Sequence, residues 1–115
     1  MPAVTIPGEP IAKGRPRFGN GRTYTPKATL EAEEHVGWLM KATGAQVDAS
    51  SRFHVGIVVK SKKAKADLDN ILKLILDAGN GVIWNDDSQV VSFTAFRSFD
   101  LCACGPQTVV SWWTL

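Results

Sequence analysis

The chain has 115 residues, of which 44% are hydrophobic and 21% charged, and its net charge is +2. This composition is typical of one globular domain and excludes a chain that is disordered throughout. The apolar run at residues 55–59 is far shorter than the ~20 residues of a membrane-spanning helix, and Glu9 and three prolines interrupt the N-terminal segment where a signal peptide is apolar. We therefore expect a cytoplasmic protein without membrane association. Cys102 and Cys104 are one residue apart and match no disulfide framework.

The charges are unevenly distributed along the chain. Five basic residues lie within the first 27 positions, four lysines lie between residues 60 and 65, and five of the eleven acids lie between residues 67 and 87. Basic flanks around an acidic centre favour an enzyme that holds a polyanion and positions a metal on it. A protein that only coats DNA gains nothing from the carboxylates. The basic residues that are candidates for binding the polyanion are Lys13, Arg15, Arg17, Arg22, Lys60, Lys62, Lys63 and Lys65.

The first half of the chain predicts one helix between two strands. Residues 3–12 indicate a short edge strand cut by prolines, and residues 13–26 indicate a loop with strand character confined to Arg22–Thr25. A helix should begin at Thr25 as N-cap and Pro26 as its first residue, and end near Gly44. Its expected apolar stripe consists of Leu30, His35 or Glu34, Val36, Leu39 and Met40. Residues 52–60 predict a buried strand.

The second half predicts one helix followed by two strands. Within residues 67–79, apolar positions recur at the spacing of a helix packed on a sheet, with Asp67 able to cap it and Gly79 able to end it. Residues 89–99 and 108–114 predict strands. The order β-α-β-α-β-β predicts a single α+β domain over residues 1–115, with one mixed sheet and two helices packed on it.

The acidic residues suggest metal chemistry. Asp67 and Asp69 lie at the start of the predicted second helix, and Asp86 and Asp87 lie just before the next strand. Mg²⁺ prefers such hard oxygen ligands, where it polarises a phosphodiester and activates water. A nearby ammonium, Lys73, would stabilise charge on the phosphate.

Alternative explanations of the polar residues stay open. Aspartates also cap helices and occupy surface turns, so either acidic group alone is weak support for a metal site. His35 and His54 with the two cysteines lack the paired spacing of a zinc site. Phe18, in the basic loop, is a candidate for stacking on a base or for packing the loop.

Three blocks in order carry a family resemblance. They are GEPIAKGRPR (residues 8–17) followed by YTP (24–26), DLDNILKLILDA (67–78) and GVIWNDDSQV (81–90). With these blocks the chain resembles the RusA family of Holliday junction resolvases of bacteria, prophages and phages. The resemblance implies a RusA-like fold and a homodimeric, Mg²⁺-dependent endonuclease that nicks two opposed strands of a four-way DNA junction in a bacterial or phage-infected cell.

The resemblance also implies roles for individual residues. It places the metal ligands at Asp67, Asp69 and Asp87 and the catalytically important lysine at Lys73, with no small-molecule cofactor. It leaves Asp86 as a supporting partner of the site or a turn residue. Asn70 and Asp77 match the motif as capping or orienting residues, and Gln89 as a residue that orients a ligand.

Two other functions remain alternatives. One is a broader debranching nuclease for flaps and forks, since selection by shape leaves no motif. The other is a non-catalytic junction-binding protein, against which the acids and Lys73 argue, because carboxylates facing phosphate weaken binding.

Overall fold

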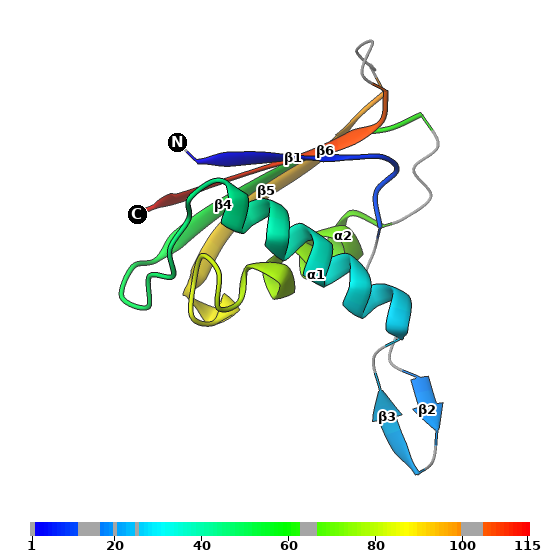
Figure 1. Ribbon diagram of the computed structural model, residues 1–115. Coiled ribbons are helices and arrows are strands. Elements are labelled where there is room, and N and C mark those ends of the chain that lie inside the picture. Colours follow the sequence, from blue (N-terminus) through cyan, green and yellow to red (C-terminus); the bar gives the residue numbers. More distant parts are fainter. Residues whose placement is uncertain (1, 12–16, 20, 25, 63–66, 100–104) are drawn as a thin grey trace.

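The computed structural model describes residues 2–11, 17–19, 21–24, 26–62, 67–99 and 105–115. They form a four-stranded sheet with both helices on one face and a separate two-stranded hairpin (Figure 1). Within these ranges, no helix is long and apolar enough to cross a membrane. The elements are β1 (Ala3–Pro7), β2 (Arg17–Gly19), β3 (Arg22–Tyr24), α1 (Lys27–Ala42), β4 (Phe53–Lys60), α2 (Leu68–Gly79), the short 3-10 helix η1 (Asp87–Gln89), β5 (Val90–Ser98) and β6 (Gln107–Thr114).

The sheet has the strand order β1-β6-β4-β5. Strand β5 is parallel to β4, with α2 as the connection between them, whereas β6 is antiparallel to both β4 and β1. The sheet is therefore mixed, and the predicted α+β architecture is confirmed. Strands β1 and β5 are its two edges, and β1 was expected at an edge.

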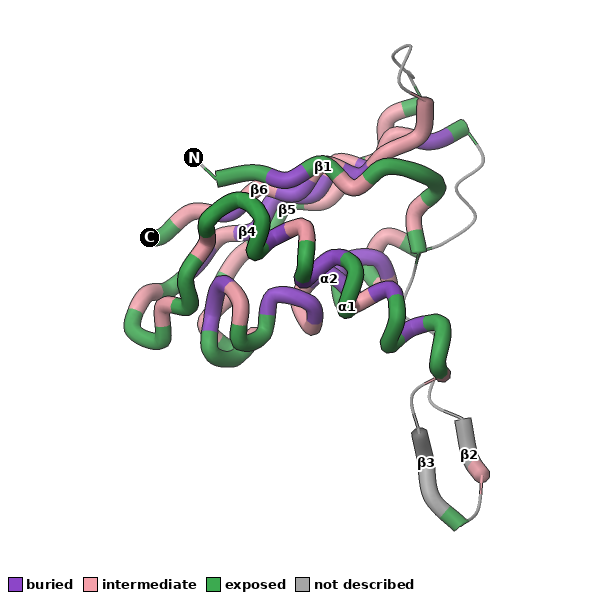
Figure 2. The backbone as a smooth tube through the Cα atoms, viewed as in Figure 1, coloured by how far each residue is buried: buried purple, intermediate pink, exposed green. Residues whose placement is uncertain are grey.

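The core lies between the sheet and the helices (Figure 2). Alternate residues of β4, from Phe53 to Val59, face the helices, and from β6 Val110 and Trp112 do the same. Helix α2 buries the predicted positions Ile71, Leu72 and Ile75 and also Leu74 and Ala78. The period-2 and period-3.6 patterns thus point to one common core.

Helix α1 differs from the prediction in its start and in its buried face. It begins at Lys27 with Pro26 as N-cap, while Thr25 lies outside the described residues. The stripe that faces the core contains Thr29, Ala32, Val36 and Met40. The expected Leu30 is 51% exposed. The inward face of α1 follows from its packing on α2, against which Gly37 lies, since a Cβ there would lie 3.4 Å from the Ala78 carbonyl oxygen.

The segment predicted as a loop contains a β-hairpin. Strands β2 and β3 pair antiparallel, with Arg17 opposite Tyr24, and the hairpin projects away from the rest of the domain (Figure 1). The sequence pattern indicated strand character only for residues 22–25, so the prediction was wrong for residues 17–19. Gly21 adopts a φ of +78°, a backbone conformation that suits a tight turn between the two strands.

Candidate active site

The acidic pair and Lys73 lie together on the first two turns of α2. Asp67 occupies the predicted N-cap position, but its side chain accepts no capping hydrogen bond. Asp69 lies in the first turn, and Lys73 follows one turn later on the same face of the helix. All three side chains are exposed. The positive end of the helix dipole favours carboxylates here, and both remain accessible to a ligand from solvent.

Asp87 lies in a structured turn at the start of η1. Its neighbour Asp86 is the N-cap of η1 and accepts a hydrogen bond of 3.0 Å from the Ser88 amide. Hydrogen bonds from the Ser88 hydroxyl and amide lower the pKa of Asp86. Asp86 is thus used by the turn itself, whereas the half-buried Asp87 is the next residue along.

Gln89 ties this turn to the segment before β4. Its Oε1 accepts hydrogen bonds from the amides of Asn85 (2.8 Å) and Asp86 (3.2 Å). Its Nε2 donates to the carbonyl oxygens of Asp48 and Ser51, both at 2.8 Å. The side-chain amide of Gln89 therefore holds the backbone that carries Asp87.

The carboxylate of Asp48 stabilises the conformation of the segment before β4. Asp48 accepts hydrogen bonds from the hydroxyls and amides of Ser50 and Ser51. These bonds, of which that from the Ser51 hydroxyl has the largest effect, lower the pKa of Asp48 to about 2. Gln89 is thus anchored to a turn with a defined conformation.

Trp84 fixes the chain between α2 and η1. Its side chain is completely buried, meets Phe53 edge to face at 5.6 Å, and donates from Nε1 to the carbonyl oxygen of Leu76. A Cβ at Gly79 would lie 2.4 Å from the Trp84 ring, so only glycine fits there. The third sequence block therefore forms a rigid support around Asp87.

The two acidic groups lie toward opposite ends of α2. The helix begins beyond the end of β4, whereas η1 leads into the start of β5, which pairs with Phe53 at the start of β4 (Figure 1). The ten residue steps from Asp69 to Gly79 rise ~15 Å along the helix axis. Among the described residues, no three His, Cys, Asp or Glu side chains lie close enough together to hold a metal ion. One chain thus groups Asp67, Asp69 and Lys73 but not Asp87.

The donor chemistry of the acidic pair nevertheless fits Mg²⁺. This ion is commonly held by one or two carboxylates, with waters and substrate phosphates completing its coordination. Asp67 and Asp69 are exposed carboxylates at a helix N-terminus, so they leave room for such ligands.

The predicted DNA-binding residues are only partly described. Lys60 is half-buried at the end of β4, and Lys62 follows it, exposed. Arg17 and Arg22 lie on the hairpin strands. The predictions for Lys13, Arg15, Lys63 and Lys65, and those for Cys102 and Cys104, lie outside the described residues.

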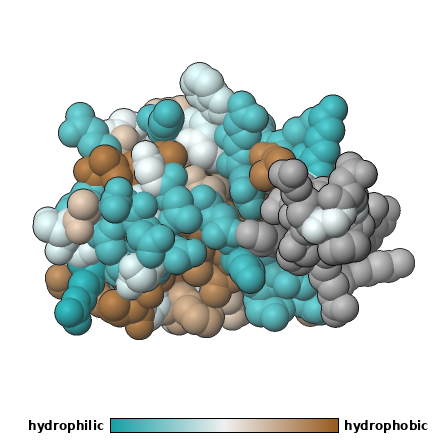
Figure 3. Space-filling view, turned by 90° about the horizontal axis from the view of Figure 1, so that it is seen from below, coloured by the Kyte–Doolittle hydropathy of each residue, from teal (hydrophilic) through white to brown (hydrophobic). Residues whose placement is uncertain are grey.

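A hydrogen bond joins the two basic segments. The Ser61 hydroxyl, which is buried, donates to Glu9 Oε2 at 2.5 Å. Glu9 follows β1 and precedes the first basic segment, while Ser61 lies within the lysine cluster. The bond therefore joins the residues that follow β1 to the residue that follows β4. Seen from below, the described surface is mostly hydrophilic with separate apolar patches (Figure 3).

Arg97 is a basic residue that the sequence analysis left unassigned. It pairs in register with Val59, so its side chain lies on the sheet face that carries the helices. It also lies near the end of β5, at the end of the sheet beyond which α2 begins. The alternation of residues along the predicted strand 89–99 was the signal that places it there.

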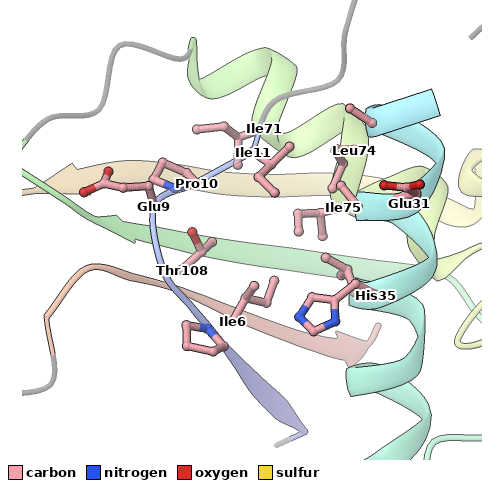
Figure 4. A pocket seen from close by; sticks show the side chains of 14 residues that line it. Ile6, Glu9, Pro10, Ile11, Glu31, His35, Ile71, Leu74, Ile75 and Thr108 are labelled. Carbon is pink, nitrogen blue, oxygen red and sulfur yellow. The ribbon is translucent and has the colours of Figure 1, made fainter. Parts of the chain in front are cut away.

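The side chains around His54 and His35 indicate structural roles for both histidines. His54 Nδ1 lies 2.7 Å from Ser92 Oγ, and the His54 ring stacks on Trp113 at 4.3 Å on the open face of the sheet. Trp112, its neighbour, faces the core, as expected for adjacent strand residues. His35 borders an apolar cavity of about 360 Å³ between β1, α1 and α2 (Figure 4). Its lining of side chains such as Ile6, Ile71 and Leu74 offers little to a phosphate or a metal.

Comparison with known proteins identifies the family. The family model described as "Endodeoxyribonuclease RusA" matches residues 7–110 and so includes the acidic pair, Lys73 and Asp87. The chain is also 27% identical over 121 residues to "Uncharacterized protein YqaN" of Bacillus subtilis (strain 168), an alignment that covers 83% of this chain and 85% of that protein. Because the family model spans nearly the whole chain, the protein belongs to the RusA family of endodeoxyribonucleases.

Proposed function

We propose that this nuclease is a Mg²⁺-dependent resolvase that cuts Holliday junctions by paired symmetric nicks and acts as a homodimer. The observation that carries the proposal is the group formed by Asp67, Asp69 and Lys73. Two exposed carboxylates and an ammonium follow one another on the first two turns of α2 in a chain of this family.

The three side chains divide the chemistry between them. Asp67 and Asp69 would hold the metal, which when bound makes the phosphodiester more electrophilic and water more acidic. Lys73 would attract the phosphate and offset the negative charge that builds up during cleavage. The carboxylates repel DNA unless a cation offsets their charge, so binding of the DNA backbone falls to the basic residues around them.

The substrate gives a first reason for a dimer. A four-way junction has two-fold symmetry, and a two-fold dimer presents two identical sites to its two opposed strands. Lys62 and Arg97, with the arginines of the hairpin, would hold the arms through phosphates. Such contacts carry no sequence information, so preference for a junction would come from shape.

The position of Asp87 gives a second reason. The family resemblance includes Asp87 among the metal ligands, yet in one chain it lies at the other end of α2 from Asp67 and Asp69. A second copy can supply Asp87 to the acidic pair of the first, and the reverse. The proposed site is therefore composite, with two carboxylates from one chain and one from its partner.

The decisive experiment compares junction cleavage by the wild-type protein and by Asp69→Asn. The substrates are a mobile synthetic four-way junction, a linear duplex and a flap, each with Mg²⁺ and with EDTA. Paired nicks in the junction alone, lost in EDTA and in the variant while junction binding persists, are the expected result. Glu34→Gln, which removes an exposed carboxylate on α1, is the matched control and should retain cleavage.

Each other outcome selects a different function. Equal cleavage of flaps and junctions identifies a general debranching nuclease. Tight junction binding without cleavage under any divalent metal identifies a binding protein and refutes the proposed chemistry.

A further inference from the structure

The four-stranded sheet has one face that no described element covers. Helices α1 and α2 both pack on the opposite face, where the core lies (Figure 1). Side chains alternate between the two faces along each strand, so every second residue of β1, β4, β5 and β6 belongs to the uncovered face. We call this surface the open face, and its side chains are unlike those of the core.

An aromatic pair stands at one end of the open face. His54 and Trp113 are partners across β4 and β6, and their rings stack at 4.3 Å with an angle of 28° between the planes. His54 Nδ1 lies 2.7 Å from Ser92 Oγ, which fixes the orientation of the imidazole. Both rings are only half-buried. His54 thus supports Trp113 as a platform on which another flat ring can stack.

The middle of the open face is flat and lined by hydroxyls. Gly56 lies between Ser111 of β6 and Thr94 of β5, and a Cβ at Gly56 would lie 3.1 Å from Ser111 Oγ and 3.3 Å from Thr94 Oγ1. No side chain therefore rises at this position. Thr5 adds an exposed hydroxyl from the edge strand β1. Hydroxyls both donate and accept hydrogen bonds, and they are common partners of phosphates and sugars.

The charges of the open face are those that suit a polyanion. In the described part of the strands, no carboxylate occupies a position on this face. Arg52 lies directly before β4 and is exposed, and Lys60 ends the strand and is half-buried. At the rise of a β-strand, these two cations are ~26 Å apart. The aromatic pair and the hydroxyls lie between them, so the surface can hold a chain of phosphates at both ends.

We propose that the open face binds single-stranded DNA, with bases stacked on the Trp113–His54 pair and phosphates held toward Arg52 and Lys60. Unpaired bases are the ligand that fits, because the bases of a duplex are already stacked on one another and a flat sheet enters neither groove. The chain belongs to a family that cuts DNA, and this second contact lies across the sheet from the acidic pair on α2. It goes beyond the proposed resolvase chemistry and does not depend on a metal.

The test measures binding of a fluorescent oligothymidylate of about 12 nucleotides by anisotropy, in EDTA so that cleavage plays no part. Trp113→Leu should raise the Kd by ~10-fold, because a base loses its stacking platform. Thr5→Glu should raise the Kd by ~5-fold, because it puts a carboxylate on the open face at an exposed position. Trp38→Leu and Ala42→Glu, both at exposed positions of α1, are the matched controls and should leave the Kd unchanged.

A second measurement uses the wild-type protein and does not depend on how well the variants fold. The same oligonucleotide, with 5-iodouracil in place of thymine, is irradiated in the complex, and the cross-linked peptides are identified by mass spectrometry. The proposal predicts adducts at Trp113 or His54. Adducts found only on α1, α2 or the hairpin overturn it.

The remaining outcomes also decide the matter. An oligonucleotide that does not bind, or that binds both open-face variants as tightly as the wild type, overturns the proposal. So does a Thr5→Glu variant that changes self-association in sedimentation velocity but not the Kd, since the open face then contacts another copy of the chain.

Junction cleavage separates this site from the proposed function. Asp69→Asn should bind the oligonucleotide as the wild type does. Binding at the open face by a protein that never cuts a junction supports the new site and refutes the resolvase. Junction resolution by a protein that ignores the oligonucleotide supports the resolvase and refutes the new site.

Discussion

Two inactive variants should restore each other if Asp87 acts across a dimer. Asp69→Asn removes a carboxylate from the pair at the start of α2, and Asp87→Asn removes the carboxylate that lies beyond the other end of that helix. Each variant alone should lose at least ~100-fold in cleavage, because both of its sites lack a ligand. In a mixed dimer, one site lacks both the Asp69 and the Asp87 carboxylates. The other site has all three carboxylates, those of Asp67, Asp69 and Asp87.

The size of the recovery follows from counting sites. Random exchange of equal amounts of the two variants gives mixed dimers as half of the total, and each has one complete site out of two. Cleavage should therefore recover to about one quarter of the wild-type number of sites. Because one site per dimer is complete, the product should be a junction nicked on a single strand.

The assay mixes the variants, allows subunit exchange, and separates nicked from resolved junctions on native and denaturing gels. Asp67→Asn mixed with Asp69→Asn is the control, since every mixed dimer then has one damaged pair in each site and stays inactive. If Asp69→Asn with Asp87→Asn also stays inactive although mixed dimers form, the composite site is wrong.

Four further outcomes test the site and its support. Lys73→Met should lower cleavage by ~100-fold with junction affinity nearly unchanged in a gel-shift assay, whereas Lys41→Met on α1 should do neither. Gln89→Leu should lower the free energy of unfolding in urea by ~2 kcal/mol, because two carbonyl oxygens lose their donor. Gly79→Ala should lower the melting temperature, since its Cβ would overlap the Trp84 ring. The lowered pKa of Asp48 stabilises the fold above about pH 4, and this contribution should disappear between pH 4 and pH 2, a decline that Asp48→Asn should weaken.

The helices and strands were predictable because their apolar periods are strong. Alternation in residues 52–60 and the spacing of Ile71, Leu72 and Ile75 each place one face in the core, and the structure confirms both. Helix α1 was less predictable, because its inward face depends on its packing against α2, which includes the contact of Gly37 with Ala78. Such a contact between two helices leaves no periodic signal in either one.

The grouping of the site residues was less accessible to sequence reasoning than their identities. Asp67, Asp69 and Lys73 are close in sequence on one helix, so helical geometry alone places them together. The place of Asp87 depends on the direction of α2 and on the parallel pairing of β4 with β5. Local sequence patterns determine neither the direction of α2 nor this strand pairing. A motif that contains all three aspartates therefore suggests a cluster that the described residues of one chain do not form.

The rigidity of the Asp87 turn is itself an argument for its proposed role. Gln89 bonds to backbone amides of the turn and to carbonyl oxygens of the segment before β4, Asp86 caps η1, and Trp84 is buried. A surface turn that only reverses the chain does not require this support. A carboxylate that must meet a metal held by another chain does require this support. The partner's acidic pair positions the metal, and only the turn itself can position the Asp87 carboxylate.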